Sequence, residues 1–141
     1  MGVSKDHIRG LSIAIIKNNG RILVSPGHDK IKDERFFRLI GGGIEFGENS
    51  LEALKREMKE ELNTELINYK LVATLENIFT FNGEPGHEIC FIYEADFKDP
   101  ANYKIEEFMI LDNKEGGRAI WLDIDGTKDK NIFPDGVANF L

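Results

Sequence analysis

Residues 42–62 read GGIEFGENSLEALKREMKEEL, a glycine-rich turn followed by a segment with helical spacing. Three glutamates in it, Glu57, Glu60 and Glu61, stand at positions i, i+3 and i+4, so a helix would place their side chains within about one turn of each other. Like charges at this spacing repel by about 0.2–0.5 kcal/mol per pair, and a bound cation would remove that cost. Oxygen ligands favour hard ions such as Mg²⁺, which also bind substrate phosphates. The stretch therefore predicts a metal-dependent enzyme acting on a phosphate compound.

The same stretch carries the signals of a helix that begins at Asn49 or Ser50. Asn49 is a favourable N-cap residue, and Glu52, three positions later, can complete a capping box. An apolar stripe follows at helical spacing, on a different face from the three glutamates. Its members are Leu51, Leu54, Met58 and Leu62. We therefore expect a helix that buries one face and presents the acidic cluster on another.

The segments around this helix have the patterns of strands, because they are rich in β-branched and aromatic residues. The predicted strands are 8–17, 21–24, 36–40, 69–81, 87–97 and 118–124. Turn signals at 18–20 and 82–83 predict two hairpins. The polar segment 26–35 predicts an exposed loop, and Phe133 or Pro134 is expected to open a short C-terminal helix. Strands on both sides of one long helix predict a mixed-sheet α/β sandwich.

Length and composition predict the general class of the protein. The chain has 141 residues, so we expect one domain over residues 1–141. No apolar run approaches the roughly 20 residues that a membrane span needs, and residues 1–10 lack the apolar stretch of a signal peptide. Cys90 is the single cysteine, which excludes an internal disulfide and fits a reducing compartment. These features predict a soluble, cytoplasmic protein without a membrane partner.

The charge of the chain restricts its partners. A formal net charge of −7 argues against binding long nucleic acids, whose phosphates require basic patches. It does not argue against a small phosphorylated substrate, because a bound divalent ion reverses the local field. We therefore expect a small-molecule partner.

The spacing of the charged residues between Gly42 and Glu61 is more specific than their number. It follows the pattern Gx5Ex7REMxEE, which resembles the Nudix box, the signature of hydrolases acting on nucleoside diphosphates linked to another group. The family pattern continues with a glycine and an aliphatic residue, where this chain has Asn63 and Thr64. Asparagine tolerates the left-handed conformation in which a helix ends. Asn63 can therefore adopt the helix-ending conformation that the family's glycine provides, and all charged positions of the motif are present.

The resemblance implies a Nudix-type α/β/α sandwich with a central mixed sheet and a glycine loop–helix catalytic motif. It also implies Mg²⁺ or Mn²⁺ as the cofactor, with Glu57, Glu60 and Glu61 as metal ligands. Glu57 is our first choice for the general base, a role whose position varies within the family. Arg56 is expected to pair with the loop carboxylate of Glu48 and so to hold loop and helix in register.

Two features near the box are candidates for contact with substrate. Gly41, Gly42 and Gly43 let the backbone bend tightly and approach a bulky polyphosphate. Phe81, on a segment flanking the box, is a candidate to stack on a nucleobase, an interaction worth about 1–3 kcal/mol per base in nucleic-acid complexes. Core packing is the alternative for Phe81 and for the other phenylalanines near the box.

Two glutamates outside the box are further candidates. Glu115, in a loop before the last predicted strand, resembles a loop glutamate that some Nudix enzymes use as an extra metal ligand or base. Glu88, near the start of the strand 87–97, is a candidate to reach the same metal. The alternative for Glu115 is a solvated surface side chain.

The favoured function is a metal-dependent hydrolase that cleaves a pyrophosphate bond in a nucleoside diphosphate derivative. The ADP-ribose subgroup carries a proline downstream of the box, where this chain has Ile78, Phe79 and Thr80, and the dinucleoside-polyphosphate subgroup has a tyrosine where this chain has Phe81. By elimination we favour a nucleoside triphosphate, normal or oxidised, hydrolysed to the monophosphate and pyrophosphate. Both other substrates and a non-catalytic nucleotide sensor stay as alternatives. Homodimers are common in the family, but no interface is identified in this chain.

Overall fold

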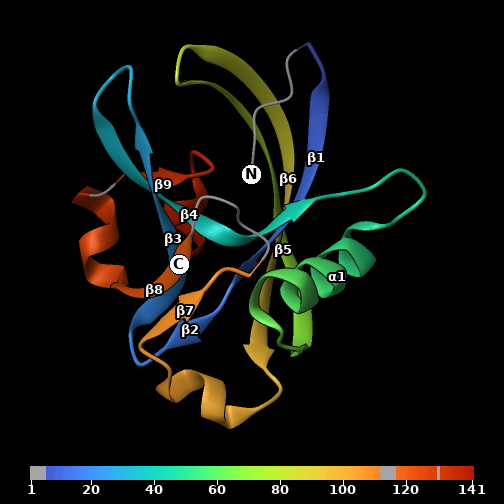
Figure 1. The fold of residues 1–141 in the computed structure, drawn as a ribbon. Coiled ribbons are helices and arrows are strands. Elements are labelled where there is room, and N and C mark those ends of the chain that lie inside the picture. Colours follow the sequence, from blue (N-terminus) through green and yellow to red (C-terminus); the bar gives the residue numbers. More distant parts are fainter. Residues whose placement is uncertain (1–5, 112–116, 130) are drawn as a thin grey trace.

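The computed structural model describes residues 6–111, 117–129 and 131–141, which form a nine-stranded sheet, one α-helix and three short 3-10 helices (Figure 1). The strands are β1 (Ile8–Ile15), β2 (Lys17–Asn18), β3 (Arg21–Asp29), β4 (Glu34–Gly43), β5 (Leu66–Phe81), β6 (Glu84–Phe97), β7 (Glu107–Met109), β8 (Arg118–Asp123) and β9 (Ile132–Phe133). The helices are α1 (Ser50–Leu62), η1 (Pro100–Lys104), η2 (Ile124–Asp129) and η3 (Val137–Phe140).

The sheet is mixed, and β4 stands in the middle of its strand order, beside the N-terminal strand β1. The strand order is β5-β6-β1-β4-β3-β8-β7, while β2 pairs with β3 and β9 pairs with β4. The β1–β6 and β4–β9 pairs are parallel, and the other pairs are antiparallel. Both predicted hairpins, β2–β3 and β5–β6, are present. This arrangement confirms the mixed-sheet α/β sandwich predicted from the sequence.

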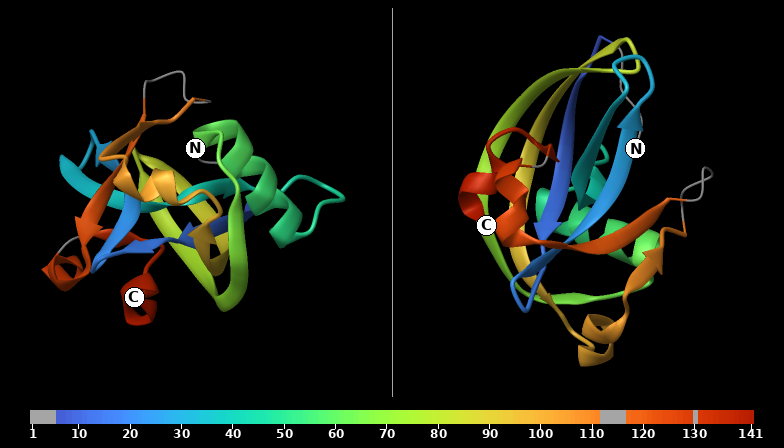
Figure 2. Two further views of the ribbon diagram at one scale, coloured as in Figure 1. Left: turned by 90° about the horizontal axis from the view of Figure 1, so that it is seen from below. Right: turned by 90° about the vertical axis from the view of Figure 1, so that its left-hand side faces the viewer.

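Apolar side chains cover both faces of the sheet. One core contains Leu54 and Met58 of α1 together with side chains of β1, β3 and β6. The other core contains Ile132 of β9 and Val137, the first residue of η3. Figures 1 and 2 accordingly show α1 and η3 on opposite sides of the sheet. The sandwich therefore holds α1 rigidly against one face, with its remaining surface free to carry polar groups.

The ends of α1 follow the predicted capping residues. The side-chain oxygen of Asn49 accepts the N–H of Glu52 at 2.9 Å, and its amide nitrogen donates to the Glu52 carboxylate at 3.0 Å. At the other end Asn63 has the left-handed φ of 50°, and its N–H donates to the carbonyl of Lys59 at 3.1 Å. The predicted helix boundaries are therefore confirmed. No helix in the described ranges is long and apolar enough to cross a membrane.

The predicted loop 26–35 is wrong over most of its length. β3 continues to Asp29 and β4 begins at Glu34, so only four residues connect them. The Asp29 carboxylate accepts the N–H groups of Ile31 and Lys32, each at 3.0 Å, which closes the turn. Cross-strand hydrogen bonds satisfy the backbone N–H and C=O groups at this exposed hairpin end, and they require no apolar side chains. The sequence pattern therefore gave little indication that the two strands extend this far.

Two further predictions need correction: the glycine turn at Gly41–Gly43 and the start of the C-terminal helix. Gly41–Gly43 are the last residues of β4 and pair with residues 11–13 of β1, rather than forming a loop. Ile132–Phe133 forms β9 beside β4, where we expected a helix to begin. The helical segment starts later and is only the short 3-10 helix η3, preceded by Gly136 with a φ of 89°.

Candidate active site

Arg56, on α1, ties the helix to the loop that precedes it. Its Nε and Nη2 atoms donate to the two carboxylate oxygens of Glu48, both at 2.9 Å. Nη2 also donates to the carbonyl oxygen of Gly43 at 2.8 Å. Bidentate arginine–carboxylate pairs are geometrically specific and stronger than neutral hydrogen bonds. The structure therefore contains the ion pair between loop and helix that the resemblance implied.

The third guanidinium nitrogen of Arg56, Nη1, reaches two of the three glutamates on α1. It donates to Oε1 of Glu57 at 3.0 Å and to Oε2 of Glu60 at 3.1 Å. The side chain of Arg56 is 23% exposed and that of Glu57 is 12% exposed, whereas that of Glu60 is 44% exposed. Charges shielded from solvent are less screened by salt than surface pairs. One guanidinium thus organises Glu48, Glu57 and Glu60 together.

The Arg56–Glu48 pair also controls ionisation. Hydrogen bonding to Arg56, together with the backbone N–H of Glu45, lowers the pKa of Glu48 to about 2. The same hydrogen bond raises the pKa of Arg56 above its ordinary value. Both groups are therefore charged at neutral pH, and the loop and helix stay joined by an ion pair.

The glycines at the end of β4 make room for neighbouring protein atoms. Gly41 has a φ of 145°, and a Cβ atom there would overlap the carbonyl oxygen of Ser12. A Cβ atom at Gly42 would overlap the carboxylate of Glu57, and one at Gly43 would press on an arginine side chain of β1. These contacts give the three glycines a reason within the protein. Their contact with substrate stays a prediction.

Glu57 and Glu61 form a close pair of carboxyl groups on α1. They lie within reach of a side-chain hydrogen bond to each other. Burial, together with the charge of Glu57, raises the pKa of Glu61 well above its ordinary value. Two carboxyl groups that share a site cannot both ionise readily unless a cation lies beside them. The pair is therefore a place where positive charge would be strongly stabilised.

The donor chemistry of this pair fits a hard divalent cation, which prefers carboxylate oxygens. Glu60 stands on the same side of the helix, but Arg56 holds its carboxylate. As they are placed, no three acidic, histidine or cysteine side chains in the described part of the chain come together closely enough to hold a metal. A three-glutamate site therefore requires the exposed Glu60 side chain to turn from Arg56 toward Glu57 and Glu61.

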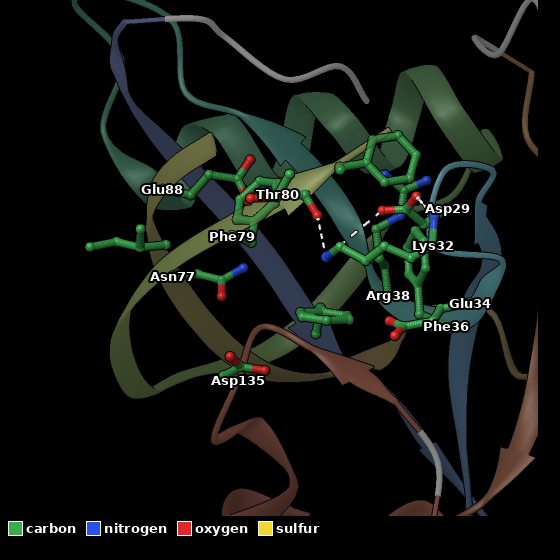
Figure 3. A pocket seen from close by; sticks show the side chains of 13 residues that line it. Asp29, Lys32, Glu34, Phe36, Arg38, Asn77, Phe79, Thr80, Glu88 and Asp135 are labelled. Carbon is green, nitrogen blue, oxygen red and sulfur yellow. Dashed lines mark hydrogen bonds and ion pairs between the residues drawn. The ribbon is translucent and has the colours of Figure 1, made fainter. Parts of the chain in front are cut away.

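A pocket of about 300 Å³ opens between β4, the β5–β6 hairpin and the C-terminal segment (Figure 3). Its aromatic walls are Phe36, Phe79, Phe81 and Phe133. Phe36 packs edge-to-face against both Phe81 and Phe133, with ring centroids 5.6 Å apart in each pair. Its charged and amide lining residues are Asp29, Lys32, Glu34, Arg38, Asn77, Glu88 and Asp135. The combination of flat apolar walls and a few polar groups is typical of a small-molecule site.

Several polar groups in the pocket wall are buried. Asn77 is 4% exposed, and neither its Oδ1 atom nor the buried Nε atom of Arg38 has a hydrogen-bond partner among the residues that the structure describes. Glu88 is 6% exposed, and burial raises its pKa. Because buried polar groups are normally paired, these atoms indicate a surface that a ligand completes. Arg38 interacts electrostatically with both Glu61 and Glu88, so the pocket adjoins the acidic face of α1.

The structure gathers most of the predicted site residues in two neighbouring places. The cluster at α1 contains Glu48, Arg56, Glu57, Glu60 and Glu61. Phe81 lines the pocket, as does Glu88. Glu115 lies outside the described residues. The catalytic, metal-binding and substrate-binding roles of these residues stay predictions.

Sequence reasoning did not single out Arg38 or Asn77. Asn77 alternates with Phe79 and Phe81, so the three side chains share one face of β5. An amide on an otherwise aromatic strand face was the available signal for Asn77. Arg38 stands inside the apolar run 36–40, and a charged residue there was the corresponding signal.

Comparison with known proteins agrees with this fold. Residues 6–135 match the NUDIX domain family. The MutT NUDIX hydrolase from Burkholderia pseudomallei is 24% identical, with a TM-score of 0.63 over 85% of this chain and 86% of that one. A NUDIX hydrolase from Nitrosomonas europaea is 20% identical, with a TM-score of 0.62 over 88% of this chain and 78% of that one. A NUDIX family hydrolase from Clostridium perfringens is 18% identical, with a TM-score of 0.63 over 93% and 91% of the two chains.

At these identities the solved structures establish a likeness of fold, while the family match spans nearly the whole chain. The match also includes the helix that carries Arg56 and its glutamate partners. The chain therefore belongs to the NUDIX domain family and is a Nudix-type hydrolase.

Proposed function

We propose that this hydrolase uses Mg²⁺ or Mn²⁺ to cleave a nucleoside triphosphate, normal or oxidised, into the monophosphate and pyrophosphate. The observation that carries the proposal is that Arg38 lines the aromatic pocket and also interacts electrostatically with Glu61 on the acidic face of α1. A nucleobase in the pocket would direct its phosphates toward Glu57 and Glu61. The small nucleotide is the proposed partner, and the cytoplasm is the proposed location.

The proposed division of roles follows from the contacts of each residue. Glu57, Glu60 and Glu61 would hold the divalent ion, with Glu115 as an additional ligand. When bound, such an ion stabilises charge that develops on phosphate oxygens and lowers the pKa of a nearby water. Glu57 accepts the proton of the attacking water.

Arg56 positions this base, because its Nη1 atom holds Oε1 of Glu57 at 3.0 Å. Glu48 in turn fixes Arg56 through two hydrogen bonds of 2.9 Å. Gly41, Gly42 and Gly43 would contact the polyphosphate, and Phe81 would stack on the base.

A substrate panel tests the reaction. The protein is incubated with Mg²⁺ and with nucleoside triphosphates, an oxidised guanine triphosphate, ADP-ribose and dinucleoside polyphosphates, with and without inorganic pyrophosphatase. We expect phosphate to appear from the triphosphates only when the pyrophosphatase is added, because pyrophosphate is the product. Turnover of ADP-ribose or a dinucleoside polyphosphate alone would replace this substrate class with an alternative one. No turnover of any member with Mg²⁺ or Mn²⁺ would favour the non-catalytic sensor.

A pair of variants tests the metal assignment. Glu61→Gln keeps the size of the side chain but removes a carboxylate from the close pair, so we expect kcat to fall by about 100-fold or more with little change in Tm. The matched control is Glu65→Gln, which removes a carboxylate that pairs with Lys98 at 3.1 Å on the surface. Similar rates in Glu61→Gln and Glu65→Gln would show that the metal binds elsewhere.

A further inference from the structure

Two buried polar side chains face each other across the β5–β6 hairpin. Asn77 and Glu88 are direct cross-strand partners, so they project from the same face of the sheet. Both line the pocket, and they are only 4% and 6% exposed. Within the described part of the chain the Oδ1 atom of Asn77 has no hydrogen-bond partner, which is costly for a buried acceptor in the absence of a ligand. Figure 3 shows both side chains in the pocket wall.

Two other charged groups of the pocket, Asp29 and Lys32, are held by contacts within the protein. The Asp29 carboxylate accepts backbone N–H groups of Ile31, Lys32 and Asn82. The Lys32 ammonium donates to the carbonyl of Thr80 at 2.8 Å. These contacts tie the β3–β4 turn to the end of the β5–β6 hairpin and form the pocket's rim. Recognition of a bound ring therefore falls to the deeper groups.

Among the atoms of the deeper polar groups, we assign two acceptors and one donor to the ligand, although the Asn77 amide and the Arg38 guanidinium carry further N–H donors. Oδ1 of Asn77 and the carboxyl oxygens of Glu88 accept hydrogen bonds, and a carboxyl group keeps acceptor capacity in either protonation state. The unpartnered Nε–H of Arg38 donates. A ligand that completes this set must offer two hydrogen-bond donors beside one acceptor. The phenylalanine walls require the ligand to be flat.

We propose that Asn77 and Glu88 are specificity-determining residues that select a guanine-type base, by accepting its ring N–H and 2-amino N–H while Arg38 donates to its carbonyl oxygen. This inference rests on the proposed nucleotide hydrolysis and names its substrate class. Guanine alone among the common bases presents a carbonyl beside two N–H donors on one edge. Uracil places one N–H between two carbonyls, and adenine and cytosine place an amino group beside an unprotonated ring nitrogen. Those edges would set acceptors against Asn77 or Glu88.

The first measurement is kcat/KM for GTP, inosine triphosphate, ATP, CTP and UTP with Mg²⁺. Inosine triphosphate differs from GTP only in lacking the 2-amino group, so it isolates one proposed contact. We expect GTP to exceed inosine triphosphate by at least about tenfold, and UTP by more, because a buried acceptor is left unpaired with the poorer substrates. Equal values for all five would overturn the inference while leaving nucleotide hydrolysis in place.

The second measurement assigns the preference to the two residues. Asn77→Leu and Glu88→Leu should remove the GTP preference over inosine triphosphate, whereas Asn77→Asp, which keeps an acceptor, should retain it. The control is Glu94→Gln on the same strand, whose carboxylate lies 3.9 Å from Lys17 at the surface and should leave the preference unchanged. A preference that survives in Asn77→Leu and Glu88→Leu would overturn the assignment.

A binding measurement separates this inference from the proposed reaction. If no triphosphate is hydrolysed, titration calorimetry with GMP, IMP and UMP still tests the pocket in the absence of turnover. Tighter binding of GMP that is lost in Asn77→Leu supports the base assignment although the proposed reaction has failed. Indifference among the three monophosphates overturns it.

Discussion

The acidic face of α1 and the aromatic pocket beside it differ in how completely their polar groups are satisfied. At α1, the guanidinium of Arg56 donates to Glu48, Glu57, Glu60 and the carbonyl of Gly43. In the pocket, Oδ1 of Asn77 is buried and has no hydrogen-bond partner in residues 6–111, 117–129 and 131–141. Fully paired networks hold their members in one arrangement, while an unpaired buried group stores free energy that a ligand can recover. The difference separates the proposed reaction centre, whose Arg56 network is internally paired, from the proposed substrate surface, which keeps a buried polar atom available for a ligand.

The two places also differ in how far apart their residues stand in the sequence. The α1 cluster lies within one loop and one helix, between Gly42 and Glu61. The pocket combines β4, both strands of the β5–β6 hairpin and the C-terminal segment. The proposed chemistry at α1 therefore depends on one short segment, whereas the proposed specificity depends on the packing of several strands of the sheet.

The largest expected effect that tests this comparison comes from Arg56→Lys. Lysine keeps the charge but cannot form the bidentate pair with Glu48 or reach its other partners at once. We expect unfolding free energy to fall by about 1.5–3 kcal/mol and activity to fall about 10–100-fold. Urea unfolding and steady-state kinetics measure the two effects.

The control for Arg56→Lys is Arg118→Lys, at a half-exposed pair with Glu107 whose N···O distance is 3.6 Å. Such surface pairs contribute about 0–1 kcal/mol, so both stability and activity should stay near wild type. If Arg56→Lys behaves like Arg118→Lys, the network at α1 is not what organises the glutamates.

Gly42→Ala tests whether the Glu57 carboxylate needs the space above β4. The added methyl group would overlap that carboxylate, so we expect a loss of about 1–3 kcal/mol in stability and a lower kcat as Glu57 moves. Gly126→Ala is the control, because no atom of the described residues lies within 4 Å of its added Cβ. Thermal unfolding and kinetics compare the two, and a fully active Gly42→Ala would contradict the role of this glycine in seating Glu57.

Acid stability provides a smaller test of the same network. The pKa of Glu48 is about 2 in the folded protein against an ordinary value of 4.5. A lowered pKa stabilises the folded state above the ordinary value, and this stability is lost as the pH falls through the folded value. We therefore expect the stability difference between wild type and Glu48→Gln to shrink from pH 4.5 to pH 2. Urea unfolding at several pH values measures it, and a difference that is independent of pH would contradict the prediction.

The sequence predicted best what depends on neighbouring residues. The caps of α1 at Asn49 and Asn63 follow from local backbone preferences, and both have the expected geometry. The pairing of Arg56 with Glu48 was implied by the motif and needs only the loop and helix to form. The mixed sheet was predicted from the order of strands around one helix. Its two hairpins were predicted from turn signals in the sequence.

The remaining features depend on contacts that no local pattern records. Arg38 on β4 interacts electrostatically with Glu88 on β6 because both strands flank β1 in the sheet. Asn77 becomes buried only when β5 pairs with β6 and the C-terminal segment covers the pocket. The hairpin ends near Asp29 are held by backbone pairing between polar residues, so hydrophobic periodicity did not reveal them.

The smallest expected effect lies in the pocket and has the opposite sign. Asn77→Leu removes a buried acceptor that no described residue pairs with, so we expect the ligand-free protein to gain about 1 kcal/mol of stability. Asn18→Leu is the matched change at a satisfied amide, whose nitrogen donates to the carbonyl of Tyr103 at 2.9 Å. That substitution should cost about 0.5–1.5 kcal/mol. Urea unfolding of both variants measures the two effects. If Asn77→Leu loses as much stability as Asn18→Leu, Asn77 supports the fold. An amide that is retained for its ligand must instead lower the stability of the ligand-free protein.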